Sequence, residues 1–153
     1  MDIDDVFTRY DQMQKARANW EQHWEEIAER DLPRSAEFTG EQEAGTKRTS
    51  KLYDATAALA LERFSSAVES LLTPRGAKWH TLRATNPLVD RDDNVRLWFD
   101  QIESLLFNFR YSPKSNFASQ MHECYMSLGA FGTAALFVDE RDVRGMTYRA
   151  VHL

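Results

Sequence analysis

Residues 4–29 carry an apolar stripe that constrains the fold of this chain more than any other feature. Its members alternate at spacings of three and four: Val6, Tyr10, Met13, Arg17, Trp20, Trp24 and Ile27. The spacing predicts one long helix of about 39 Å, with Arg17 as the only polar residue of the stripe. Asp4 and Asp5 suit its N-terminal dipole, and Pro33 blocks its continuation. We expect the stripe to pack in the core; a coiled-coil partner is the alternative.

Three further amphipathic helices are predicted after a polar connection at 31–51. They span roughly 52–72, 93–109 and 116–128. Ser50 is the expected N-cap of the first of these, and Gly129 the expected C-terminal cap of the last.

The end of the chain changes from helical to alternating patterning. Two β-prone runs predict a hairpin at roughly 133–153, and residues 78–84 alternate well enough for a short strand. The fold class is therefore α+β and mostly α-helical, with about four amphipathic helices before a C-terminal hairpin. The last strand runs straight to Leu153, so we expect residues 1–153 to be a single domain or a fragment of a longer protein.

Composition narrows the function classes. The formal net charge of the 153 residues is −5, which argues against general affinity for duplex DNA because such binding needs clustered Lys and Arg. Cys124 is the only cysteine, so no intramolecular disulfide is possible and a reducing compartment fits. No apolar run is long enough to cross a bilayer, and we expect no membrane partner.

A near match to a phosphate-binding loop lies at 40–54. Gly40 and Gly45 are spaced as in such a loop, but Thr46 separates the second glycine from Lys47. The lysine is one position late, and no buried strand precedes the loop, so nucleotide binding is rejected. Lys47, Arg48 and Lys51 form a small basic cluster, which is either a solvated loop or a contact for a partner.

Other site patterns fail on spacing. Asp90, Asp92 and Asn94 alternate like the start of a calcium loop, but Val95 and Gln101 occupy the positions that need Gly and Glu. The acidic run is better explained as capping of the third helix.

Metal and catalytic sites are not indicated either. His122 and Cys124 lie about 200° apart around a helix and cannot share a metal. No recognisable catalytic motif is present, so we expect no enzymatic activity, no metal and no cofactor.

Four short motifs in order carry a more specific signal. They are the basic residues Lys47 and Arg48, a YD-x-T-A helix start, an LTP…W helix exit and a GT-A-L start of a strand. The chain resembles the N-terminal part of the head-to-tail connecting (portal) proteins of short-tailed bacteriophages, and the resemblance covers nearly its whole length. The motif positions are Tyr53, Asp54, Thr56, Leu72, Thr73, Pro74, Trp79, Gly132 and Thr133.

The resemblance implies a structural virion protein with a wing-like fold. Such proteins form a ring, typically a dodecamer, at the head–tail junction, after assembly in the host cytoplasm. DNA passes through the ring without sequence preference, and the terminase, tail adaptors and capsid proteins are the implied partners. The alternative is a stand-alone helical interaction module or prophage remnant that forms no pore.

Overall fold

The computed structural model describes residues 2–40, 43, 45–49, 51–141 and 145–153. These residues form α1 (Ile3–Asp31), a 3-10 turn (Pro33–Ser35), α2 (Thr56–Leu72), α3 (Asp93–Arg110), α4 (Phe117–Phe131), β1 (Ala135–Arg141) and β2 (Gly145–Val151). The two strands pair antiparallel, with Ala135 opposite Val151 and Arg141 opposite Gly145. The predicted α+β class, four helices followed by a hairpin, is confirmed.

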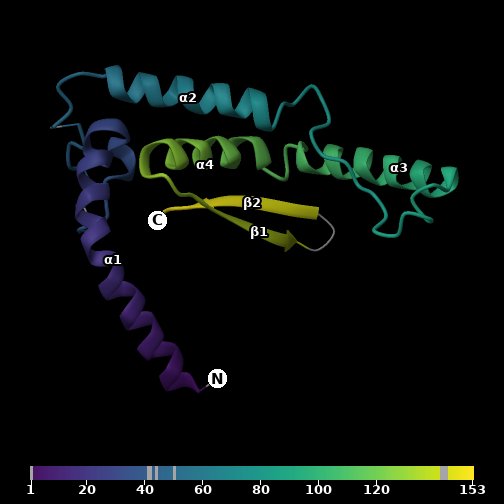
Figure 1. Cartoon of the computed structure of the whole chain (residues 1–153). Coiled ribbons are helices and arrows are strands. Elements are labelled where there is room, and N and C mark those ends of the chain that lie inside the picture. The colour runs from purple at the N-terminus through teal and green to yellow at the C-terminus, as the bar shows by residue number, and fades with distance from the viewer. Residues whose placement is uncertain (1, 41–42, 44, 50, 142–144) are drawn as a thin grey trace.

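α4 is the middle layer of the structure. It lies between α2 on one side and the hairpin on the other (Figure 1). Phe117, Cys124 and Tyr125 are therefore buried on α4, while Leu61 of α2 and Tyr148 of β2 complete the small core from either side. A helix enclosed by two layers must be apolar around most of its circumference.

The close approach of α2 to α4 depends on small residues. Ser65 is fully buried, and its hydroxyl donates to the Leu61 carbonyl at 2.9 Å. A Cβ atom at Gly129 would lie 2.7 Å from Leu61 Cδ1 and 2.9 Å from Phe64 Cδ1. Gly129 is thus required for helix packing, and the prediction that it caps α4 is wrong. The cap is Gly132, whose φ of 73° suits glycine.

α1 departs most from expectation. Figure 1 shows its N-terminal part leaving the body of the molecule. Along it, Val6, Tyr10, Met13 and Trp20 are all exposed, and only its C-terminal end is packed, with Ala28 buried. The prediction that the whole stripe packs in the core is therefore wrong for residues 3–20, because no other element among the described residues covers them.

Two local predictions also fail. Residues 78–84 form no strand, because no neighbouring segment pairs with their backbone and the Leu82 amide instead donates to the Glu103 carboxylate. α2 begins at Thr56 and not near 52, because Asp54 organises a turn before it. The predicted N-cap Ser50 lies outside the described residues.

Among the helices of the described part, none combines the length and apolarity that crossing a lipid bilayer requires.

Candidate functional site

The basic cluster of the connection lies beside acidic side chains. Arg48 donates to the Arg34 carbonyl at 2.7 Å and pairs with Glu37. Lys51 lies 2.6 Å from Glu29, and this hydrogen bond raises the lysine's pKa. Lys47 is exposed. Two of the three basic side chains, Arg48 and Lys51, thus form ion pairs with nearby carboxylates. A role of the cluster in contact with a partner stays a prediction.

The YD-x-T-A motif forms the start of α2. Asp54 accepts hydrogen bonds from the Thr56 amide at 3.1 Å and hydroxyl at 2.9 Å, and these bonds lower the pKa of the carboxyl. A carboxylate there also interacts favourably with the positive end of the helix dipole. Tyr53 is 95% exposed beside a cleft of about 720 Å³ between the ends of α1 and α2. This motif therefore has a local, helix-starting role.

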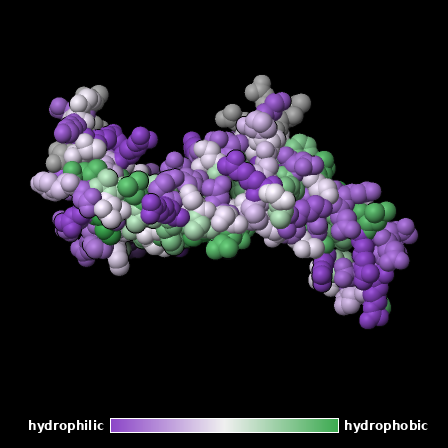
Figure 2. All heavy atoms as spheres, turned by 90° about the horizontal axis from the view of Figure 1, so that it is seen from above, coloured by the Kyte–Doolittle hydropathy of each residue, from purple (hydrophilic) through white to green (hydrophobic). Residues whose placement is uncertain are grey.

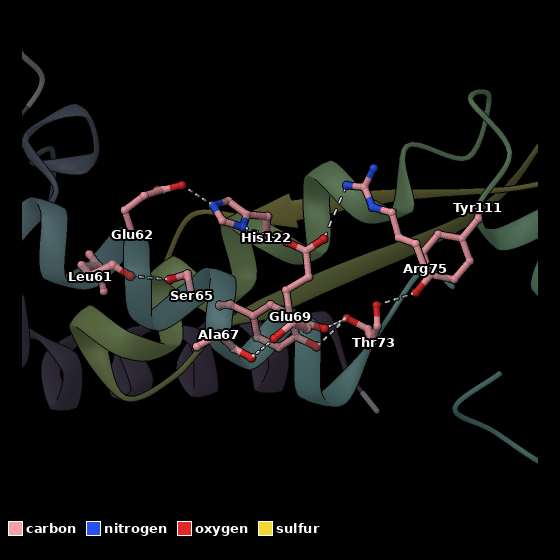
Figure 3. Close-up of polar contacts among 11 residues, drawn as sticks. Leu61, Glu62, Ser65, Ala67, Glu69, Thr73, Arg75, Tyr111 and His122 are labelled. Atoms are coloured by element: carbon pink, nitrogen blue, oxygen red, sulfur yellow. Dashed lines mark hydrogen bonds and ion pairs between the residues drawn. The ribbon is translucent and has the colours of Figure 1, made fainter. Parts of the chain in front are cut away.

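The LTP…W motif makes long-range contacts. Thr73 is buried where α2 ends; its hydroxyl lies 3.1 Å from the Tyr125 hydroxyl of α4. Its carbonyl accepts a bond from the Tyr111 hydroxyl at 2.8 Å, and Tyr111 accepts the Trp79 indole N–H at 3.0 Å. Figure 3 shows Thr73 and Tyr111 pointing toward one another. We call Thr73, Trp79, Tyr111 and Tyr125 the motif junction, because it ties α2, α3 and α4 together.

Aromatic packing continues the motif junction toward the hairpin. Trp79 stacks on Phe117 with ring centroids 6.2 Å apart, and Phe117 meets Tyr148 edge-on at 4.9 Å. The Arg110 guanidinium lies 4.8 Å from the centre of the Trp79 ring. These contacts make the segment after Pro74 part of the packed body although it has no regular secondary structure.

The remaining motif positions lie apart from the motif junction. Leu72 is 58% exposed and Pro74 half-buried at the end of α2. Gly132 and Thr133 are exposed between α4 and β1. The nine positions therefore do not form one site: all except Trp79 lie near the ends of elements, and of the nine only Thr73 and Trp79 belong to the motif junction.

His122 forms a second polar contact between α2 and α4. Its Nδ1 lies 3.0 Å from Glu69 and its Nε2 3.2 Å from Glu62, as Figure 3 shows. Carboxylates can only accept, so both bonds together require the doubly protonated imidazolium. Burial lowers the pKa of His122, but the hydrogen bonds and charges of Glu69 and Glu62 outweigh burial, and the pKa is raised above 6.5. Arg75 also contacts Glu69, at 3.4 Å.

The other titratable candidates are packed side chains. Burial raises the pKa of the Cys124 thiol, which makes it a poor nucleophile. Burial and the nearby Arg110 lower the pKa of His80. Over the residues that the structure describes, no three His, Cys, Asp or Glu side chains gather as metal ligands would.

The acidic run before α3 has a capping role. Asp92 caps α3 by accepting a hydrogen bond from the Asn94 amide at 2.8 Å, which confirms the capping interpretation of the acidic run.

Phe38 is a structural residue that the sequence patterns did not reveal. It contacts Trp24, Phe131 and His152, with ring centroids 5.6, 5.2 and 4.7 Å away. Its amide donates to Glu25 at 2.6 Å. In the sequence, the one sign of this packing role is that Phe38 is an isolated aromatic residue within a polar connection. Through it, the start of the 32–55 connection joins α1, α4 and the chain end.

Comparison with known proteins decides the family. The sequence profile described as Bacteriophage head to tail connecting protein matches residues 4–153. The chain belongs to this family. The chain is 30% identical over 134 residues to the "Probable portal protein" of Bordetella phage BPP-1, across 87% of this chain and 24% of the relative. It is 29% identical over 135 residues to the "Portal protein" of Salmonella phage epsilon15, across 86% and 23%.

The expected family resemblance is thereby confirmed. The chain spans about a quarter of the length of these curated relatives. Both matches cover most of this chain, so the motif junction and the His122 contact lie within the region that is similar to these portal proteins.

Proposed function

We propose that this connecting protein is a structural component of a phage virion and contributes to the portal ring at one capsid vertex. Phage DNA would be packaged and ejected through that ring, and terminase, tail adaptors and capsid proteins would attach to it. The observation that carries the proposal is the family match over residues 4–153, together with two relatives named as portal proteins. We propose no enzymatic role.

Two physical properties support the proposal. A net charge of −5 disfavours stable phosphate contacts, and a protein that surrounds moving DNA must not bind it tightly. Second, the chain leaves large apolar side chains uncovered at several places, among them Phe7, Tyr10 and Trp98. Figure 2 shows hydrophobic patches separated by hydrophilic ones along the elongated molecule. Such patches suit contacts between identical subunits.

Electron microscopy tests the proposed function. The purified full-length protein is expected to form closed rings with a central channel, and image classes would count the subunits, for which we propose twelve. Sedimentation velocity over a wide range of concentration gives the independent measure of mass. A protein that stays monomeric at every concentration, or that forms only open chains, would contradict the portal role. Rings also exclude a stand-alone module that makes no pore.

A further inference from the structure

The chain exposes far more surface than its mass requires. Its accessible surface is 11560 Å² at 17.7 kDa. A folded monomer of that mass exposes about 7,900 Å², so roughly 3,700 Å² is in excess. Stable interfaces bury about 800 Å² on each partner, and obligate ones more. The excess is enough for a subunit that makes two such contacts.

Two helix faces contribute large apolar parts of that surface. On α1, residues 3–20 expose Ile3, Val6, Phe7, Tyr10, Met13 and Trp20 by 46–70% each. On α3, the exposed side chains Trp98, Leu105 and Phe109 lie along one line of the helix, with Leu97 beside them, each 47–58% exposed. Both segments are about 27 Å long at 1.5 Å per residue. They lie at opposite ends of the molecule (Figure 1).

Charge selects how these two faces can meet. The start of α1 carries Asp2, Asp4 and Asp5, whereas α3 ends at the basic residue Arg110, and Lys114 follows four residues later. An antiparallel pairing of α1 with α3 places these opposite signs together, and it also opposes the two helix dipoles favourably. A parallel pairing would place the three aspartates beside Asp92 and Asp93.

We propose that residues 3–20 of α1 dock antiparallel on the exposed face of α3 of a second copy of this chain. The two faces differ, so a pair of copies joined by one such contact still offers one free α1 face and one free α3 face. The contact is therefore head-to-tail and repeats until it closes or grows into a filament. This inference rests on the proposed function, because a repeating contact of this kind is what builds a ring.

A two-component cross-link tests the pairing. One preparation carries Phe7→Cys on α1 and another carries Leu105→Cys on α3, with a distinguishing tag on each, because the antiparallel pairing places these two exposed positions side by side and a parallel pairing would separate them. A short bis-maleimide is expected to link the two chains in the mixture and to give little product with either alone. The wild-type chain is the control, because its Cys124 is buried. Linking of the Phe7→Cys chain to itself, or no linking in a mixture that does self-associate, overturns the proposal.

Surface substitution supplies the second measurement. The double change Tyr10→Ser and Met13→Ser is expected to weaken self-association by about tenfold or more in sedimentation equilibrium, because apolar interface centres carry much of the affinity. Leu71→Ser is the matched control, since Leu71 is 79% exposed but lies on neither face. Circular dichroism should show unchanged folding for all three preparations.

The outcomes separate the two proposals. Rings that form equally well with the α1 double variant, and without α1–α3 cross-links, overturn this inference and leave the portal function standing. Cross-links between α1 and α3 in open filaments support the inference and contradict the ring. A wild-type chain that never self-associates overturns both.

Discussion

Tyr111 has the most demanding role among single residues, because its hydroxyl accepts from Trp79 and donates to Thr73. Tyr111→Phe leaves the indole N–H and the carbonyl without that partner in a half-buried place. We expect the free energy of unfolding to fall by about 1–3 kcal/mol. Urea denaturation measures this loss. Tyr53→Phe, at a 95% exposed position, is the control and should stay within about 0.5 kcal/mol of wild type. If Tyr111→Phe and Tyr53→Phe lowered the free energy of unfolding equally, the stabilising role of the motif junction would be contradicted.

His122 should make stability depend on pH. Its folded-state pKa is raised, so the contact with Glu62 and Glu69 stabilises fully below about pH 6.5 and is lost as pH rises through the folded-state pKa. We expect the free energy of unfolding to be about 1 kcal/mol higher at pH 6 than at pH 8. Denaturant titrations at both pH values check the difference.

Two variants separate His122 from the other histidines. His122→Gln should abolish the difference between pH 6 and pH 8, while His23→Gln, on the exposed side of α1, should preserve it. A pH dependence that survives His122→Gln would show that another group controls it.

At the scale of the elements, the distance between α2 and α4 is set by Gly129. A methyl group there meets Leu61, which is buried and has little room to move. Overpacking typically costs about 1–3 kcal/mol, against a gain of about 1 kcal/mol in helix propensity. Gly129→Ala should therefore lower the unfolding free energy by about 1 kcal/mol in urea titrations.

The matched change for Gly129→Ala is Gly76→Ala, where no atom lies within 4 Å of the added Cβ. We expect that variant to unfold like wild type. If Gly129→Ala instead proved more stable than wild type, the two helices would have room to separate.

At the scale of the whole molecule, the chain is elongated because α1 and α3 extend in different directions from the α2, α4 and hairpin layers (Figure 1). A compact chain of this length has a radius of gyration of about 15 Å. Small-angle scattering of the dilute monomer should give a clearly larger value. A radius near the compact one would mean that α1 folds back on the body and that its apolar face is covered within the chain.

Much of the local structure was decided by the sequence alone. Helical spacing located all four helices, and alternation located the hairpin, because these patterns reflect backbone geometry that each segment carries by itself. The start of α3 was likewise predictable, since the Asp92 side chain caps its own helix. The sequence located helix boundaries less well, as at the start of α2, where the turn that Asp54 organises delays the helix to Thr56.

Only the tertiary structure decided which faces are covered. The stripe of α1 has the spacing of a packed helix, yet Tyr10 and Met13 are exposed, because spacing says that a face is apolar and not what lies against it. A glycine near the end of a helical pattern predicts a cap at Gly129. Its actual role depends on Leu61, which is far away in the sequence, so no local pattern could indicate it. Phe38 and the Trp79–Tyr111–Thr73 chain escaped prediction for the same reason: their partners are brought together by packing, which no local pattern records.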